Sequence, residues 1–228
     1  WPAGHGKQPL YILDSKLYIK NSSIPSDGRL VRFGICDLKW GQLDGIPEDF
    51  INPLKLTVNG RRIRTMGSNM SSPDLLHGRA HNKGRIFVQR AIEAGFNTLR
   101  MHGGQIIFTE DFYDACDEMG IMLSIEFPVG NCMLEEDEDI VAHWSRVVLD
   151  IVKLLRNHPC IIEWSGGNEM AWQQDTIHPA LTAAREIISK EDGRFFRATC
   201  PAQGVRHAPW DYNPLIHYKL YNSESMRD

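Results

Sequence analysis

The stretch that decides the fold reads FNTLRMHGGQIIFTEDFYDACDEMGIMLSIEF and covers residues 96–127. It opens with a β-prone run at 96–101 and closes with another at 121–127. Between them, Thr109 can cap the start of a helix and Gly120 can end it. A strand, a helix and a second strand in this order predict two neighbouring parallel strands joined by a crossover helix.

The same alternation continues on both sides of this unit. The acidic run at 135–139 is typical of a helix N-terminus, because negative side chains there interact favourably with the helix dipole. We expect further helices at 82–94, 135–156 and 179–189, and further strands at 63–69, 160–165, 196–200 and 215–218. With the two strands above, these make about six strands of an eight-stranded barrel. The predicted fold class is therefore α/β, an incomplete (β/α)8 TIM barrel.

The first 56 residues have a different character. They are rich in Gly, Pro, Asp and Ser, and they contain short β-prone runs at 10–13, 17–20, 30–35 and 54–58. No helical pattern separates these runs, so we expect an antiparallel sheet. The chain is accordingly divided into an all-β part at 1–56 and a barrel part at 57–228.

Composition argues against several classes of function. The chain has 228 residues, of which 42% are hydrophobic and 24% charged, as is typical of a globular protein. A net charge of -4 and the lack of a basic run argue against nucleic acid as a partner. No apolar stretch approaches the roughly 18 to 20 residues that cross a membrane. The five cysteines are scattered and form no C-x-x-C pair, so neither a disulfide framework nor a zinc knuckle is predicted. Compartment and oligomeric state stay open.

Candidate site residues follow from the expected barrel. Catalytic groups of a TIM barrel lie where its strands end, because the interior is packed and the loops after the strands form the cavity. Amide, guanidinium, imidazole and carboxylate groups suit sugar hydroxyls, which need directional donors and acceptors, and an aromatic ring can stack on a sugar face. Residues of these kinds near the predicted strand ends are Asn69, Arg100, His102, Glu126, Asn168, Glu169, Trp172 and His217.

Glu169 stands out among these candidates. It follows Gly166 and Gly167, which allow a tight turn or a close approach to a ligand at the end of a buried strand. Its neighbour Asn168 is a neutral amide that can donate to a hydroxyl. We therefore expect Glu169 to carry the chemistry.

Two of the other charged residues have alternative roles that the residues alone leave open. Arg100 either reaches a substrate or pins an inward-facing acid such as Glu126. Glu163 is either a partnered internal charge or a half-exposed residue that faces a helix. For His102, contact with a substrate is favoured over a place in the core.

An ordered series of motifs identifies a family. The run HPCIIEWSGGNE at 158–169 resembles the acid/base signature of glycoside hydrolase family 2, the group of β-galactosidases, β-glucuronidases and β-mannosidases. Asn97-x-x-Arg100 and the run FYDACDEMGI at 112–121 look closest to the β-mannosidase branch. The segments at 1–11 and 32–35 resemble the last strands of the immunoglobulin-like domain that precedes the barrel in this family.

The resemblance implies a retaining exo-β-glycosidase, β-mannosidase-like, that acts on terminal β-linked sugars of a glycoside or oligosaccharide. Glu169 is then the general acid/base, Asn168 binds the sugar 2-hydroxyl, and His217 lines the cleft. Such a double displacement needs a second, ionised carboxyl about 5 to 5.5 Å away as nucleophile. In this family it is a Glu at the end of the seventh strand, which we expect beyond the C-terminus. Neither an organic cofactor nor a metal is implied.

Other functions stay open as alternatives. His102 stands where the β-mannosidase branch usually has Trp, so β-galactosidase, β-glucuronidase or exo-β-glucosaminidase specificity is not excluded. A carbohydrate-binding protein without catalytic activity is an alternative from another class.

Both ends are interpreted as cut, which leaves part of the immunoglobulin-like domain and most of the barrel. Because the nucleophile is then missing, we expect the isolated 228-residue chain to be inactive on any aryl β-glycoside. Glu224 lies in a polar run with no predicted strand before it, and is a poor substitute. Turnover by the isolated chain that disappears with Glu224→Gln would contradict this prediction.

Overall fold

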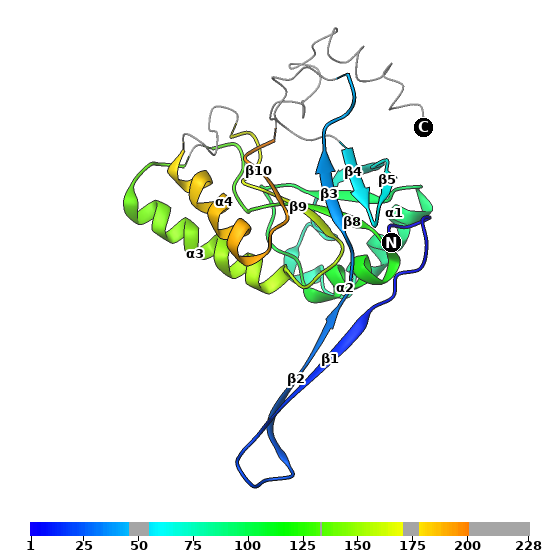
Figure 1. The fold of residues 1–228 in the computed structure, drawn as a ribbon. Coiled ribbons are helices and arrows are strands. Elements are labelled where there is room, and N and C mark those ends of the chain that lie inside the picture. The colour runs from blue at the N-terminus through cyan, green and yellow to red at the C-terminus, as the bar shows by residue number, and fades with distance from the viewer. Residues whose placement is uncertain (46–54, 133, 171–177, 201–228) are drawn as a thin grey trace.

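A computed structural model describes residues 1–45, 55–132, 134–170 and 178–200 (Figure 1). A parallel sheet of five strands forms its centre, in the order β10-β9-β8-β7-β6. The bounds of the sheet strands and of the helices that connect them are β6 Gly67–Met70, α1 Gly84–Glu93, β7 Thr98–Met101, α2 Glu110–Met119, β8 Met122–Glu126, α3 Glu138–Leu155, β9 Ile161–Ser165, α4 Pro179–Glu191 and β10 Phe195–Arg197. A short 3-10 helix, His77–Arg79, precedes α1.

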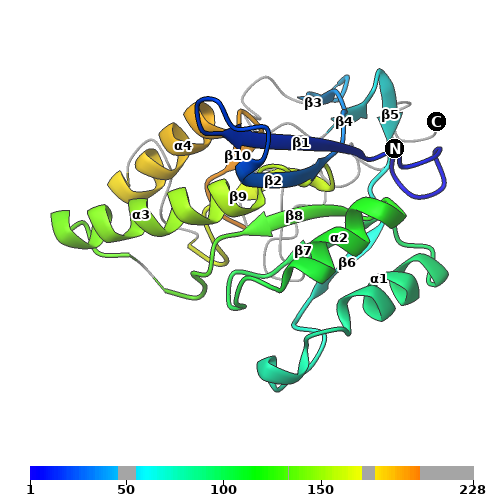
Figure 2. The ribbon, with the colours of Figure 1, turned by 90° about the horizontal axis from the view of Figure 1, so that it is seen from below.

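The four helices lie along one face of the sheet (Figure 2). One helix follows each of the strands β6 to β9, and every neighbouring pair of strands is parallel. The main core lies between helices and sheet, and its largest fully buried side chains include Trp164, Phe127 and Phe112. This is part of a (β/α)8 barrel, which confirms the predicted α/β class. The strand expected at 215–218 lies outside the described residues.

The helix ends follow the sequence signals in two cases out of three. Gly120 ends α2 in the left-handed conformation with φ 81°, and its N–H donates to the carbonyl of Cys116 at 2.8 Å. Asp137 caps α3 by accepting from the N–H groups of Asp139 and Ile140 at 2.9 and 3.2 Å, so the acidic run does mark a helix start. Thr109 occupies the N-cap of α2, but its hydroxyl bonds to the carboxylate of Asp111 instead of a backbone group.

The first part of the chain forms two small antiparallel sheets. Strands β1 (Tyr11–Tyr18) and β2 (Pro25–Phe33) make a hairpin that projects from the rest of the molecule (Figure 1). Strands β3 (Leu38–Gly41), β4 (Lys55–Val58) and β5 (Arg61–Ile63) make the other sheet.

Three sequence predictions in this part were wrong. The runs at 10–13 and 17–20 belong to one strand, β1, whose side chains are all exposed, so no alternation of burial marks its length. Strand β3 was not expected at all. Ile63 closes β5, which pairs antiparallel with β4, and so does not open the first barrel strand; that strand begins at Gly67. The two strands were merged because β6 reads Gly-Ser-Asn-Met, a run of low β-propensity.

The sheet β3-β4-β5 packs at the N-terminal ends of the barrel strands. Leu56, Val58 and Ile63 form a second core with Met122, the first residue of β8, and Ile162 of β9. Residue 56 therefore lies inside β4 and within this core, so no break in secondary structure coincides with the expected boundary at 56–57. The division into domains stays a prediction.

Several residues of the motifs at 97–100, 112–121 and 158–169 connect secondary-structure elements of the fold. Asn97 accepts from the N–H of Met66 and donates to the carbonyl of Arg64, both at 2.8 Å, and so fixes the turn between β5 and β6. His158 bonds to Asp117 of α2 through Nδ1 at 2.7 Å, which anchors the start of β9. The motifs thus contain scaffold residues as well as site residues.

Candidate active site

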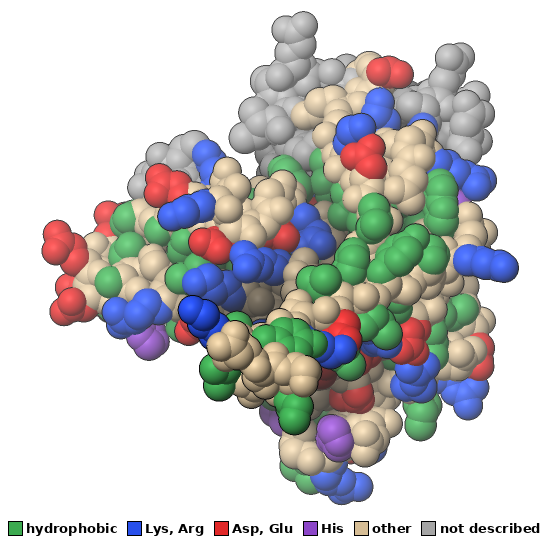
Figure 3. Space-filling model, turned by 60° about the horizontal axis from the view of Figure 1, so that its bottom comes forward, with side chains coloured by type: hydrophobic (Ala, Val, Ile, Leu, Met, Phe, Trp, Pro, Cys, Tyr) green, Lys and Arg blue, Asp and Glu red, His purple; other side chains and the backbone are tan. Residues whose placement is uncertain are grey.

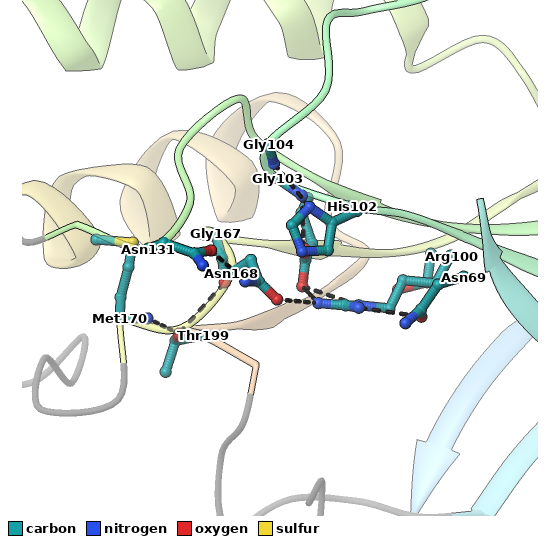
Figure 4. A network of polar contacts seen from close by, with 12 residues as sticks. Asn69, Arg100, His102, Gly103, Gly104, Asn131, Gly167, Asn168, Met170 and Thr199 are labelled. Carbon is teal, nitrogen blue, oxygen red and sulfur yellow. Dashed lines mark hydrogen bonds and ion pairs between the residues drawn. The ribbon is translucent and has the colours of Figure 1, made fainter. Parts of the chain in front are cut away.

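Polar side chains from neighbouring strands meet at the C-terminal end of the sheet (Figure 4). The predicted residues Asn69 of β6, Arg100 of β7, Glu126 of β8 and Asn168 after β9 form one hydrogen-bonded network. Trp172 and His217, which were also predicted, lie outside the described residues. Residues from four barrel strands, or directly after them, thus contribute to one site although they are far apart along the chain, as barrel geometry requires.

Arg100 is the centre of the network. Its Nε and Nη2 donate to Oε1 of Glu126 at 3.0 and 2.6 Å, and Nη2 also donates to Oδ1 of Asn168 at 2.8 Å. Its Nη1 donates to Oδ1 of Asn69 at 3.0 Å. The sequence left two roles open for Arg100. The geometry shows the one in which Arg100 holds the carboxylate of Glu126 in place. Contact between Arg100 and a substrate stays a prediction.

Glu126 is held deep in the site, with a side chain that is 1% exposed. Burial raises the pKa of this carboxyl, and the nearby guanidinium of Arg100 opposes the rise. The second oxygen, Oε2, accepts from the N–H of Gly103 at 2.7 Å. A Cβ at Gly103 would lie 2.2 Å from the carbonyl oxygen of Val129 and 2.9 Å from the nitrogen of Asn168, so only glycine allows the loops to approach this closely.

Asn168 has a fixed amide orientation. A guanidinium has only donors, so the atom of Asn168 that faces Arg100 must be the oxygen. The amide nitrogen then donates to Oδ1 of Asn131 at 2.7 Å, and the backbone N–H of Asn131 donates to the carbonyl of Asn168 at 2.9 Å. One amide N–H is left to donate elsewhere.

Asn131 was missed by the sequence analysis. It lies in the loop after β8 in the left-handed conformation, with φ 57°, which Asn adopts more readily than most residues. The pair Gly130-Asn131 after a buried strand is a turn signal that draws attention to this loop. Nothing in the local sequence pairs it with Asn168, which is 37 residues away.

Glu169 follows the last residue of β9, Ser165, by four residues, so it stands on a turn beyond the strand and not at its end. It is exposed, whereas its neighbours Asn168 and Met170 are 2% and 0% exposed. Its φ is 51°, an uncommon and strained value for a residue with a side chain. Strain of this kind persists only where the surroundings determine the backbone, and it is concentrated at functional sites.

His102 follows β7 directly, beside Gly103 and Gly104 (Figure 4), and is half-buried. Its Nδ1 accepts from the N–H of Gly104 at 2.9 Å. An accepting Nδ1 carries no proton, so the proton of the neutral ring is on Nε2. Contact with a substrate, favoured from the sequence, is not tested by this geometry.

A second buried ion pair lies next to this network in the barrel. Glu163 of β9 accepts from Oγ of Ser124 at 2.6 Å and from Nη2 of Arg197 at 3.0 Å. Of the two roles left open for Glu163, it therefore has the first, a partnered internal charge. Cys200, three residues beyond Arg197, is also buried, and burial raises the pKa of its thiol to about 11.

One group of side chains has the composition of a metal site but lies at the other end of the strands. Oxygen and nitrogen atoms of Asp114, Asp117 and His158 lie within 4.8 Å of one another. Asp114 forms an ion pair with Arg32, and Asp117 accepts from His158 and from the N–H of Cys160. These contacts explain the group without an ion.

Comparison with known proteins identifies the family of the chain. Residues 51–188, more than half of the chain, match the family described as "Glycosyl hydrolases family 2, TIM barrel domain". The chain belongs to glycosyl hydrolase family 2. Among curated members, the β-mannosidase of Capra hircus is 32% identical over 174 residues, or 74% of this chain. The β-mannosidase of Rattus norvegicus is 28% identical over 231 aligned residues, or 90% of this chain.

Solved structures of other proteins share the fold of this chain. A β-D-mannosidase from Dictyoglomus thermophilum matches 88% of this chain with a TM-score of 0.72 and 24% identity. The exo-chitosanase CsxA of Amycolatopsis orientalis matches 94% with a TM-score of 0.70 and 22% identity. This chain spans 19% of the goat enzyme and 26% of each of these two structures. Within the described ranges, no helix is long and apolar enough to cross a membrane.

Proposed function

We propose that the protein containing this chain is a retaining exo-β-glycosidase of family 2, with β-mannosides as its first candidate substrates. The observation that carries the proposal is the arrangement around Glu169. An exposed carboxyl is held on a strained turn at the C-terminal end of the barrel, next to an asparagine whose amide is oriented on both sides. This is what a proton-transferring group beside a sugar hydroxyl requires.

In the proposed reaction, Glu169 gives its proton to the glycosidic oxygen while the bond from C1 to that oxygen breaks. A second carboxylate attacks C1 and forms a covalent glycosyl-enzyme. Water then attacks C1 and gives a proton to Glu169, which returns to its starting state as the second carboxylate leaves. The remaining amide N–H of Asn168 donates to a hydroxyl of the sugar.

The second carboxylate is proposed to lie outside the described residues. Glu126 and Glu163, the two glutamates in the barrel strands that the structure describes, are each bound to an arginine. Both carboxylates are thus already paired inside the barrel, with side chains that are only 1% and 10% exposed, so neither is proposed as the nucleophile. The family resemblance points instead to a glutamate at the end of a later strand.

Residues 1–56 are proposed to belong to an all-β, immunoglobulin-like domain. The hairpin β1-β2 exposes large apolar side chains: Ile12, Leu17, Ile24 and Leu30 are 64–74% exposed. Figure 3 shows exposed apolar side chains among charged ones on this side of the molecule. An isolated two-stranded hairpin is marginally stable in water, so we expect further strands of the same domain to cover these side chains.

A panel of aryl β-glycosides tests the proposed specificity on the full-length protein. We expect the highest kcat/KM for the β-mannoside, because curated β-mannosidases match most of this chain. The other substrates in the panel are the galactoside, glucoside, glucosaminide and glucuronide. A preference for one of these would contradict the mannoside assignment. No turnover of any, combined with calorimetric binding of an oligosaccharide, would contradict the enzyme and favour the carbohydrate-binding alternative.

A further inference from the structure

The turn that carries Glu169 is bound from below by the segment after β10. The hydroxyl of Thr199 accepts from the N–H of Met170 at 3.0 Å and donates to the carbonyl of Gly167 at 3.2 Å (Figure 4). These two contacts lie on either side of Glu169 along the chain. One side chain thus holds the turn on both sides of the proposed acid/base.

Backbone contacts complete this attachment. The N–H of Glu169 donates to the carbonyl of Cys200 at 2.6 Å, and the N–H of Cys200 donates to the carbonyl of Gly167 at 3.1 Å. The backbone contacts do not depend on which residues occupy positions 199 and 200. The two contacts of the Thr199 hydroxyl do depend on the residue at position 199, so they are the part of the attachment that the sequence specifies.

Burial makes this hydroxyl hard to replace. Thr199 and Met170 are 4% and 0% exposed, so water does not reach the N–H of Met170 from outside. Without the hydroxyl that N–H is left unpaired in the interior. Glu169, with φ 51°, has a conformation that its surroundings must impose, whereas glycine adopts the φ of 155° at Gly167 readily.

We propose that Thr199 is a positioning residue for Glu169. Its hydroxyl holds the backbone of the turn in the conformation that presents the carboxyl to the glycosidic oxygen. Thr199 itself lies beneath the turn and has no contact with the sugar. The inference rests on the proposed function of Glu169, and it adds a residue that the acid/base motif at 158–169 does not contain.

Thr199→Val tests the proposal, because valine has the shape of threonine without the hydroxyl. In the full-length protein we expect kcat for an alkyl β-glycoside to fall about tenfold or more, a part of the effect of losing the general acid. We expect KM to stay within about twofold, since no group that contacts the sugar is removed. Thr199→Ser keeps the hydroxyl and should restore most of the lost turnover.

The dependence on leaving group separates positioning from a loss of folded enzyme. Dinitrophenolate leaves without being protonated. Turnover of a dinitrophenyl glycoside is therefore limited by the second step, in which Glu169 takes a proton from water. Azide anion attacks C1 without releasing a proton and forms a glycosyl azide. Azide should therefore increase the rate at which the Thr199→Val variant turns over the dinitrophenyl glycoside. It should have little effect on the rate of the parent enzyme. Equal losses on both substrates without any effect of azide would overturn the proposal.

Thr98→Val is the matched control. It makes the same substitution at the start of β7, at the opposite end of the strands, and removes a hydroxyl that donates to Asn97 at 2.8 Å. We expect it to lower the unfolding temperature while the ratio of turnover on the two substrates stays that of the parent. A changed ratio in this control would show that general destabilisation accounts for the effect and would overturn the proposal.

The outcome for Glu169→Gln distinguishes a failure of the proposed function from a failure of the proposed role of Thr199. If Glu169→Gln leaves turnover of the alkyl glycoside unchanged, the proposed function is wrong. If Glu169→Gln abolishes it and Thr199→Val matches the parent, only the role of Thr199 is wrong. Should Thr199→Val fail to fold, Thr199→Ala removes the same hydroxyl from a smaller side chain, and the same substrate ratio and azide effect decide the question.

Discussion

Glu169→Gln in the full-length protein should lower kcat/KM for an alkyl β-glycoside by about 1,000-fold. General acid catalysis typically contributes about 100- to 10,000-fold, and an alkoxide leaves poorly without a proton. Glutamine keeps the size of the side chain and removes the proton that Glu169 transfers. Initial rates on alkyl and dinitrophenyl glycosides measure the effect, which should be much smaller in the first step of the dinitrophenyl substrate.

Glu186→Gln provides the control for this substitution. Glu186 is exposed on α4, and the same exchange there should leave kcat/KM within about twofold of the parent. An unchanged rate of Glu169→Gln on the alkyl glycoside would assign the acid role to another residue.

The strand and helix pattern of the barrel can be predicted because burial marks it. Strands β8 and β9 are buried at every position, and glycine and acidic residues mark the ends of α2 and the start of α3. Strands β1 and β5 carry no such signal, since β1 is exposed throughout and β5 has three residues, two of them exposed arginines. Their limits are set by pairing with other strands, which no local pattern records.

Some of the site residues can likewise be predicted from the sequence, and others cannot. Asn168 and Glu169 can be found from sequence because they follow a buried strand and two glycines. Asn131 and Thr199 cannot, because their function depends on partners 37 and 29 or more residues away. The choice between two roles for Arg100 also needed the fold, since only the pairing of β7 with β8 brings Arg100 to Glu126.

Arg100→Met should lower the free energy of unfolding by about 3–5 kcal/mol at neutral pH. The substitution leaves the carboxylate of Glu126 in the interior without its cation, and loss of one partner of a buried ion pair typically costs this much. The Glu126 side chain is 1% exposed, so water does not replace the guanidinium. Urea unfolding followed by tryptophan fluorescence measures the change, and a loss below about 1 kcal/mol would contradict the central role of Arg100 in holding the site.

The double variant Arg100→Met with Glu126→Gln tests the cause, because it removes the uncompensated charge together with its partner. It should recover a large part of the loss. Arg156→Met is the control for a more exposed pair: the side chains of Arg156 and Glu191 are 38% and 23% exposed, and loss of their ion pair should cost about 0–1 kcal/mol.

The loss of stability caused by Arg100→Met should depend on pH. Burial already raises the pKa of Glu126 in the folded protein, and removal of Arg100 raises it further. A carboxyl with a raised folded-state pKa favours folding below its unfolded value of about 4.3, and this contribution is lost as pH rises through the folded pKa. The difference in stability between Arg100→Met and the parent should therefore be small near pH 4 and grow toward neutral pH. A difference that is constant over this range would mean that Arg100 stabilises the site through packing and its bonds to Asn69 and Asn168, and not through the charge of Glu126.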